Sequence, residues 1–174
     1  HNRIKMVTHS IGEVIPALDK EEQRLLSIPE ANELIVTVDG GHVKTTEEQR
    51  SIEALAAVVY RPESIVANAK GTRNHLISKS CAASVRDDEQ EEMKSSTIIA
   101  AMKEGLTSNT KITALCDGAK NCLNVIESLR PLCGGMTCIL DWFHLAMKIQ
   151  NISLPEQLKQ RLIRAKWHLW RGNT

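Results

Sequence analysis

Three aspartates of this chain come directly after short runs of apolar and β-branched residues: Asp39, Asp117 and Asp141. Acids that follow strands lie at the carboxyl edge of a sheet, where α/β proteins place ligands and catalytic groups. Asp39 and Asp117 are each followed by glycine, which lets a backbone, a metal ion or a substrate approach closely. If their strands are neighbours, we expect the two carboxylates to converge.

The pair Asp39 and Asp117 has the chemistry of a site for hard metal ions. Two converging carboxylates repel each other unless a cation lies between them. Oxygen-only ligands suit Mg²⁺ or Mn²⁺, and two such ions about 3.5–4 Å apart promote phosphodiester cleavage or transfer. The pair therefore predicts a site for two Mg²⁺ or Mn²⁺ ions. The competing interpretation is local structure, because Asp-Gly is also a common turn signal.

Five predicted strands would position these acids. Residues 34–38 form a β-branched run that ends in Asp39-Gly40-Gly41, so we expect a buried strand running into a turn. Similar patterns predict four more strands, at residues 52–60, 75–85, 111–116 and 137–140. Helices are predicted from the acidic cluster 87–92 to Gly105, at 119–129, at 142–151 and from Ser153 onward. This order predicts an α/β fold whose mixed sheet has an antiparallel opening meander and a parallel half.

Composition places the chain among ordinary globular proteins, with 42% hydrophobic and 25% charged residues. No run approaches the roughly 20 apolar residues that span a bilayer, so we expect no membrane protein and a cytoplasmic location. The five cysteines form no C-x-x-C pair, which favours small, reduced core residues over a zinc ribbon. Net charge is only +1, but the residues after 157 include five lysines and arginines and no acid.

Three segments carry a resemblance to a known family: VTVDGG at residues 36–41, LCDGA at 115–119 and ILDWFH at 139–144. In this order they resemble bacterial insertion-sequence transposases of the DDE class. The third segment resembles the Asp-aromatic-aromatic-His motif of that class, where the chain leaves the fifth strand before a helical insertion. Residues 169–172 (LWRG) resemble a segment within the insertion. The resemblance covers residues 33–172.

The resemblance implies an RNase H-like mixed five-stranded sheet, made of a three-strand antiparallel meander and two parallel strands and flanked by helices. Asp39 resembles the first catalytic acid and Asp117 the second, and both would hold the metal pair. The third acid of the family is a Glu on a helix beyond the insertion. We expect it to lie past Thr174, so that the fragment is inactive alone.

The chain is predicted to have three parts. Residues 1–33, with a short helix around 17–27, are expected to be a linker or an arm from a preceding domain. Residues 34–152 would form the RNase H-like catalytic core without its last helix. Residues 153–174 would begin the helical insertion.

Three further residues are candidates for an auxiliary role in the site: Asp141, His144 and Glu156. Asp141 and His144 lie one helical turn apart, and we expect Asp141 to organise the local loop with His144. Glu156 has a spacing that suits a third acid in a family member without the insertion. Its competing explanation is a capping box with Ser153, which accounts for it fully.

The basic C-terminal segment is a candidate DNA contact through four residues: Lys159, Arg161, Arg164 and Lys166. Such a helix binds the phosphate backbone through counterion release, and a solvated helix face is the equal alternative. Trp167 and Trp170 are expected to be packing residues rather than base-stacking ones.

The leading functional hypothesis is a transposase core that hydrolyses a DNA strand and then directs the 3′-hydroxyl onto target DNA. Its partners would be transposon ends, target DNA and further copies of itself in a synaptic complex, in the bacterial cytoplasm and on the nucleoid. The first alternative is an RNase H-like nuclease or resolvase that only hydrolyses. The second is a non-catalytic, degenerate or domesticated remnant that binds DNA.

Overall fold

The computed structural model describes residues 28–44, 51–86, 88–153 and 155–172. The chain forms two compact units, one up to Ile139 and one from Leu140 onward, and each is described by itself. The helix predicted around residues 17–27 and most of the predicted linker lie outside the described residues. The predicted boundary between core and insertion, at 152/153, stays a prediction.

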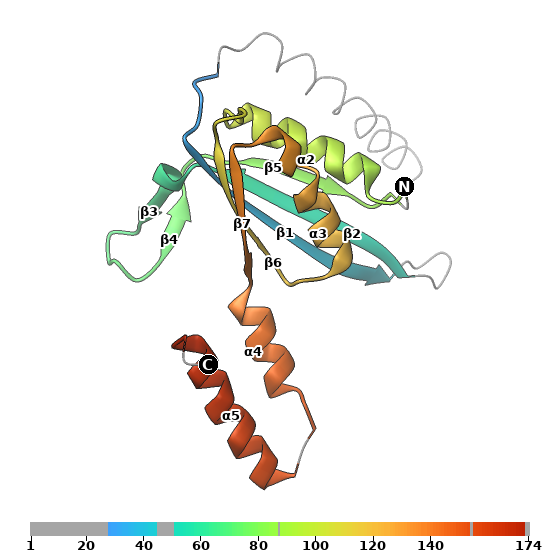
Figure 1. Cartoon of the computed structure of the whole chain (residues 1–174), viewed down its shortest axis with the longest axis vertical. Helices are drawn as coiled ribbons and strands as arrows, with labels where there is room; N and C mark the ends of the chain where they lie inside the picture. Colours follow the sequence, from blue (N-terminus) through green and yellow to red (C-terminus); the bar gives the residue numbers. More distant parts are fainter. Residues whose placement is uncertain (1–27, 45–50, 87, 154, 173–174) are drawn as a thin grey trace, which may run out of the picture. The chain divides into compact units, whose positions relative to one another are not determined.

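The first unit is built on a five-stranded sheet with the order β5-β2-β1-β6-β7 (Figure 1). Its central strand β1 (Glu33–Lys44) pairs antiparallel with β2 (Ser51–Tyr60) and parallel with β6 (Lys111–Cys116). β5 (Ser80–Ser84) pairs antiparallel with β2, and β7 (Gly135–Leu140) forms the other edge. The sheet is mixed, as predicted, and is consistent with an RNase H-like fold.

β1 is longer than the sequence predicted. The prediction that the first strand stops before Asp39-Gly40-Gly41 is wrong, because β2 pairs with β1 as far as Lys44, which lies opposite Ser51. Neither Gly40 nor Gly41 has a positive φ, so both continue the extended strand. Asp39 therefore lies within β1, at the level where the neighbouring β6 ends.

The predicted third strand is also partly wrong. Asn74–Leu76 (β4) pairs with Ile65–Ala67 (β3) in a separate two-stranded sheet, and only Ser80–Ser84 joins the main sheet. The short helix η1 (Pro62–Ser64) ends β2 and opens this hairpin. A backbone hydrogen bond of 3.0 Å from Ile77 N to Ser64 O closes it. The two halves of the predicted strand thus have different partners.

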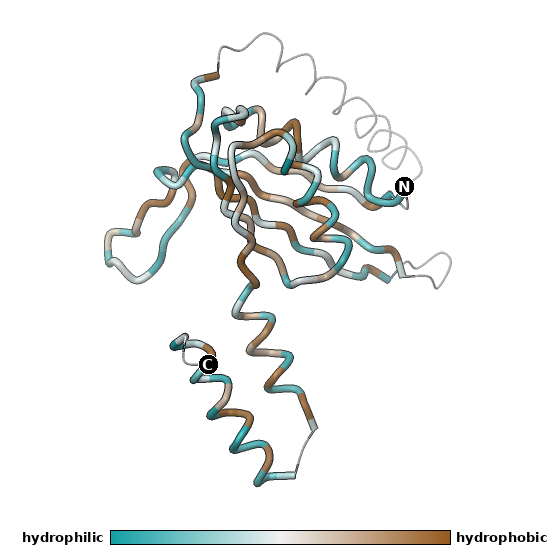
Figure 2. The backbone as a smooth tube through the Cα atoms, viewed as in Figure 1, coloured by the Kyte–Doolittle hydropathy of each residue, from teal (hydrophilic) through white to brown (hydrophobic). Residues whose placement is uncertain are grey.

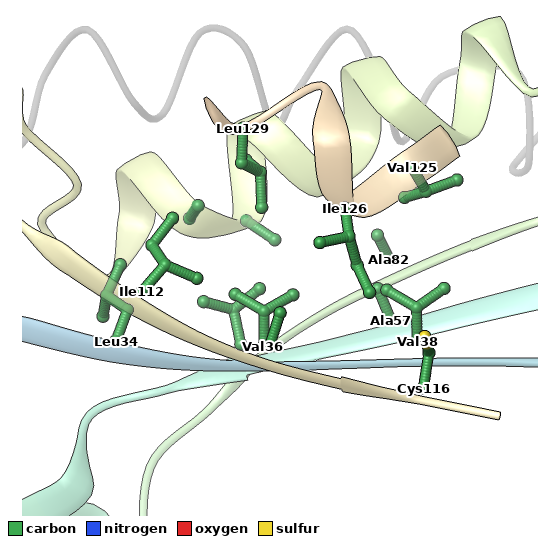
Figure 3. Close-up of a cluster of buried hydrophobic side chains, with 14 of the residues drawn as sticks. Leu34, Val36, Val38, Ala57, Ala82, Ile112, Cys116, Val125, Ile126 and Leu129 are labelled. Carbon is green, nitrogen blue, oxygen red and sulfur yellow. The ribbon is translucent and has the colours of Figure 1, made fainter. Parts of the chain in front are cut away.

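Two helices, α2 (Glu91–Lys103) and α3 (Lys120–Glu127), pack on the sheet, and η2 (Arg130–Leu132) follows them. Side chains of β1 alternate strictly between buried and half-buried up to Val38, as expected for a strand with one face against helices. The buried positions of β1 and β6 meet α3 and the turn after it in one apolar cluster (Figure 3): Leu34, Val36, Val38, Ile112, Cys116, Val125, Ile126 and Leu129. This core fixes which face of β1 and β6 points toward the helices.

The cysteines only partly follow the expectation of core residues. Cys116 and Cys122 are buried, but Cys81 and Cys138 are exposed, and all five are free thiols. Cys138 is exposed because β7 is an edge strand in which every residue except Met136 is exposed. The prediction that Cys138 is a core residue is therefore wrong.

The second unit is a pair of helices, α4 (Trp142–Gln150) and α5 (Glu156–Trp170). The rings of Trp142 and Trp170 lie 4.9 Å apart between centroids and join the two helices. Polar and apolar segments alternate along α5 (Figure 2), as in an amphipathic helix. None of the helices in the described ranges is both long and apolar enough to cross a membrane.

Thr110 ties the segment before β1 to the turn before β6. Its fully buried hydroxyl donates to Ala31 O at 2.7 Å and accepts from Thr107 N at 2.9 Å. Lys111 N also donates to Asn32 O at 2.9 Å, directly beside it. These bonds hold the start of the parallel β1–β6 pair.

We predict that Thr110→Val lowers the free energy of unfolding by about 1–3 kcal/mol, because it leaves a buried carbonyl and an N–H without their partner. Thr110→Ser keeps both hydrogen bonds and should stay within about 1 kcal/mol of the parent. Urea unfolding measures both, with Thr137→Val at an exposed position of β7 as the matched control. Equal stability of Thr110→Val and the parent would contradict this role.

Candidate metal centre

The parallel register of β1 and β6 brings Asp39 and Asp117 to the same level. Thr37 lies opposite Leu115, and continuing this register by two residues sets Asp39 beside Asp117. Neighbouring strands lie about 4.8 Å apart, so the two acids leave the sheet as direct neighbours. The two principal residues predicted from the sequence are thus brought together by a single strand pairing.

Each of these carboxylates is held by a backbone N–H. Asp39 Oδ1 accepts from Gly40 N at 2.8 Å, and Asp117 Oδ1 accepts from Ala119 N at 2.8 Å. Gly118 has a φ of +82°, a conformation that side chains disfavour, and it lets the chain turn from β6 into α3. The glycine after Asp117 therefore serves the turn, and the turn fixes the carboxylate at the end of β6.

A negative potential surrounds this pair of acids. Burial raises the pKa of the Cys122 thiol to about 12, and negative neighbours add to the effect. In decreasing order these neighbours are Asp117, Cys116, Asp39 and Glu53. Cys122 lies in the first turn of α3, so both aspartates act on one buried sulfur atom. A divalent cation at the pair would offset this accumulation of negative charge.

Glu53 is a third acid near the pair that sequence reasoning missed. It lies opposite His42 in the β1–β2 pairing, and its Oε1 accepts a hydrogen bond from Asn121 Nδ2. A Cβ built on Gly40 would lie 3.8 Å from both Cys122 Sγ and Glu53 Oε1. Glu53 could have been found from the sequence, because it is an acid within the apolar strand Ser51–Tyr60, two residues before the buried Leu55 and thus on the same face.

Glu53 does not complete a three-acid site with the aspartates. It shares the parity of Leu55 and so lies on the helix-covered face, whereas Asp39 follows the buried Val38 and alternates to the other face. Among the residues that the structure describes, no group of three or more His, Cys, Asp or Glu is placed to hold a metal ion. Asp39 and Asp117 supply an oxygen-only pair that fits Mg²⁺ or Mn²⁺ as part of a ligand set.

The auxiliary candidates lie in the second unit. Asp141 caps α4 by accepting from Phe143 N at 2.9 Å, and its Oδ2 lies 2.8 Å from His144 Nδ1. Glu156 is the first residue of α5, and its Oε1 accepts from Gln160 Nε2 at 3.0 Å. The capping box expected between Ser153 and Glu156 is wrong, because α5 begins after Pro155 and no side chain caps it.

The four predicted DNA contacts divide between two faces of α5. Lys159 and Lys166 are seven residues apart and share one face of the helix. Arg161 and Arg164, three residues apart, lie on another. The segment is therefore not one uniform basic surface.

The raised pKa of Cys122 predicts a pH-dependent stability. The folded thiol keeps its proton up to about pH 12, while the unfolded thiol releases it near its ordinary pKa of 9.0. Stability from this group is therefore present below pH 9.0 and is lost as the pH rises toward 12. In Cys122→Ser, unfolding free energy should fall less steeply with pH above 9.0, by up to about 1.4 kcal/mol per pH unit. Urea unfolding across this range measures the slope, and identical slopes in both proteins would contradict the placement of the thiol.

Comparisons with known proteins leave the family open. No family model matches the chain, and no curated protein matches it. Among solved structures it is similar to LC9-RNase H1, a type 1 RNase H with the type 2 active-site motif, at 10% sequence identity and a TM-score of 0.35. The match covers 67% of this chain and 65% of that one. A structural similarity at this level of identity and TM-score gives no information on the activity or the substrate of this chain.

Proposed function

We propose that the first unit is the catalytic core of a divalent-metal-dependent enzyme that cleaves phosphodiester bonds, and that its substrate is DNA. The observation that carries the proposal is the juxtaposition of Asp39 and Asp117 on neighbouring parallel strands. A pair of carboxylates held by backbone N–H groups is a ready ligand set for Mg²⁺ or Mn²⁺. After burial, both aspartates contribute to the raised pKa of the nearby Cys122 thiol.

The residues of the chain have defined roles in such a reaction. Asp39 is fixed within β1 and Asp117 at the turn after β6, so their spacing is set by a sheet and not by a loop. Bound Mg²⁺ or Mn²⁺ would supply a Lewis acid for the phosphate oxygens and lower the pKa of a coordinated water. The aspartates would hold that charge beside the scissile phosphate without forming a covalent link to DNA.

Within this class we propose a transposase core over a nuclease that only hydrolyses. Support comes from the order of the three Asp-containing segments and from the α4–α5 helix pair that follows the fifth strand. The two activities differ in their products. With Mn²⁺, a donor end bearing a free 3′-hydroxyl and a plasmid target, a transposase joins the two, whereas a nuclease or resolvase gives only shortened strands. Products of either kind separate these two activities, and neither product is the result expected of a chain whose third acid lies past Thr174.

The metal site itself is tested by Mn²⁺ titration calorimetry. We expect Asp39→Asn and Asp117→Asn each to weaken Mn²⁺ binding by about ten-fold or more, because each removes one charged ligand. Glu63→Gln, which removes an exposed acid of η1, is the matched control and should bind as the parent does.

Unchanged Mn²⁺ affinity in both aspartate variants, with circular dichroism like that of the parent, would make the two residues turn and strand elements and refute the metal site. Loss of binding in the Glu63→Gln control would mean that general negative charge, and not the aspartate pair, attracts the ion.

A further inference from the structure

One side of α5 concentrates arginines, with a histidine, around an exposed indole. Arg164 and His168 are spaced i, i+4 and share a face of α5, with Arg161 one turn earlier. Arg171, the residue that ends α5, lies at i+7 from Arg164 and continues this side. A hollow of about 420 Å³ is lined by Arg164, Trp167, His168 and Arg171. We call Arg161, Arg164, His168 and Arg171 the arginine face.

The arginine face points away from the helix on which α5 packs. The half-buried residues of α5 are Leu162, Ile163 and Lys166, and the ring of Trp170 contacts Trp142 of α4. At about 100° per residue these positions lie on the side opposite the arginine face. Packing within the second unit therefore uses one side of α5 and leaves the arginine face exposed.

The charge of this face is not neutralised within the described part of the chain. Elsewhere in the described residues, Arg130 forms an ion pair with Glu127 at 2.5 Å, and Lys94 forms one with Glu91 at 2.7 Å. No ion pair of that kind involves Arg161, Arg164 or Arg171 among the described residues, and no acid follows Glu156 in the sequence. A guanidinium cluster without acids attracts a polyanion, and its planar groups match phosphate oxygens.

Trp167 adds a second kind of chemistry to the face. Its side chain is 48% exposed, and Lys166 Nζ lies 5.0 Å from the centroid of its ring. Both tryptophans were expected to be packing residues, but only Trp170 has an aromatic partner, in Trp142, within the described residues. An exposed indole among cations can stack an unpaired nucleobase, since every base offers a π-face.

We propose that the arginine face and Trp167 bind single-stranded DNA, with the guanidinium groups at the phosphates and the indole against a base. The inference rests on the proposed function for the choice of DNA, and it names the surface that holds the strand. Single strands are favoured over duplex because a base can reach Trp167 only when it is not stacked inside a helix.

Binding is tested on the full chain by fluorescence anisotropy with a labelled oligothymidylate of about 12 nucleotides, in EDTA so that the metal site plays no part. Arg164→Gln/Arg171→Gln should weaken binding about ten-fold and reduce the salt dependence of log K by about 1.4, the value for two lost phosphate contacts on a single strand. The matched control is Lys70→Gln/Lys148→Gln, which removes the same charge from exposed positions off the arginine face. It should bind nearly as the parent does.

Trp167→Leu should weaken binding roughly five- to a hundred-fold, and Trp167→Tyr should restore most of it, because a phenol ring also stacks. The oligonucleotide should quench tryptophan fluorescence in the parent and far less in Trp167→Leu, where Trp142 and Trp170 remain. A structural role for Trp167 alone would leave this quenching unchanged.

Equal losses in the arginine and lysine double variants would overturn the proposal, since charge in general would then account for binding. Equal affinity for duplex of the same sequence, or preferred binding to anionic phospholipid vesicles, would overturn it too. Asp39→Asn/Asp117→Asn should keep oligonucleotide binding while losing Mn²⁺ binding. Oligonucleotide binding and Mn²⁺ binding are thus expected to be lost in different variants, so the failure of one inference leaves the other standing.

Discussion

The parallel pairing of β1 with β6 is the constraint on which the rest of the first unit depends. It joins residues 33–37 to residues 111–115, so the entropy of closing a long loop must be offset by burial. That burial comes from the inward side chains of both strands, which meet α2 and α3 in one core. Thr110 reinforces the same junction with hydrogen bonds at its start. Without this pairing, the two aspartates would have no fixed relation.

The same pairing concentrates negative charge at one end of β6. Asp39 and Asp117 meet there, Glu53 lies on the other face nearby, and burial together with these acids raises the pKa of the Cys122 thiol. Like charges brought together by folding oppose the folded state, and a bound cation reverses the sign of that contribution. If the ion binds as proposed, it stabilises the folded state most at this cluster. The same residues would then serve both the stability of the fold and the proposed chemistry.

In the second unit, α5 meets two different physical demands. α5 has to pack on α4 through apolar side chains while carrying cations and no acid after its first residue. Helical periodicity separates these demands, since residues three, four and seven apart share a side. Lys166 consequently lies on the packing side, and the arginines lie on the exposed one. A single tryptophan at the border of these two sides gives the basic surface an aromatic element.

The sequence by itself determined most of the local elements and the expectation that Asp39 and Asp117 lie together. The strand at residues 111–116 was predicted with the bounds it has, because its alternation and the following Asp-Gly are local signals. The length of β1, the β3–β4 hairpin, and the approach of Glu53 and Cys122 to Asp39 were decided by the tertiary structure. Each depends on a partner strand or helix distant in sequence, and the residues of one segment do not identify that partner. The division of the basic segment into two faces was decided in the same way, because packing on α4 selects the side of α5 that is left exposed.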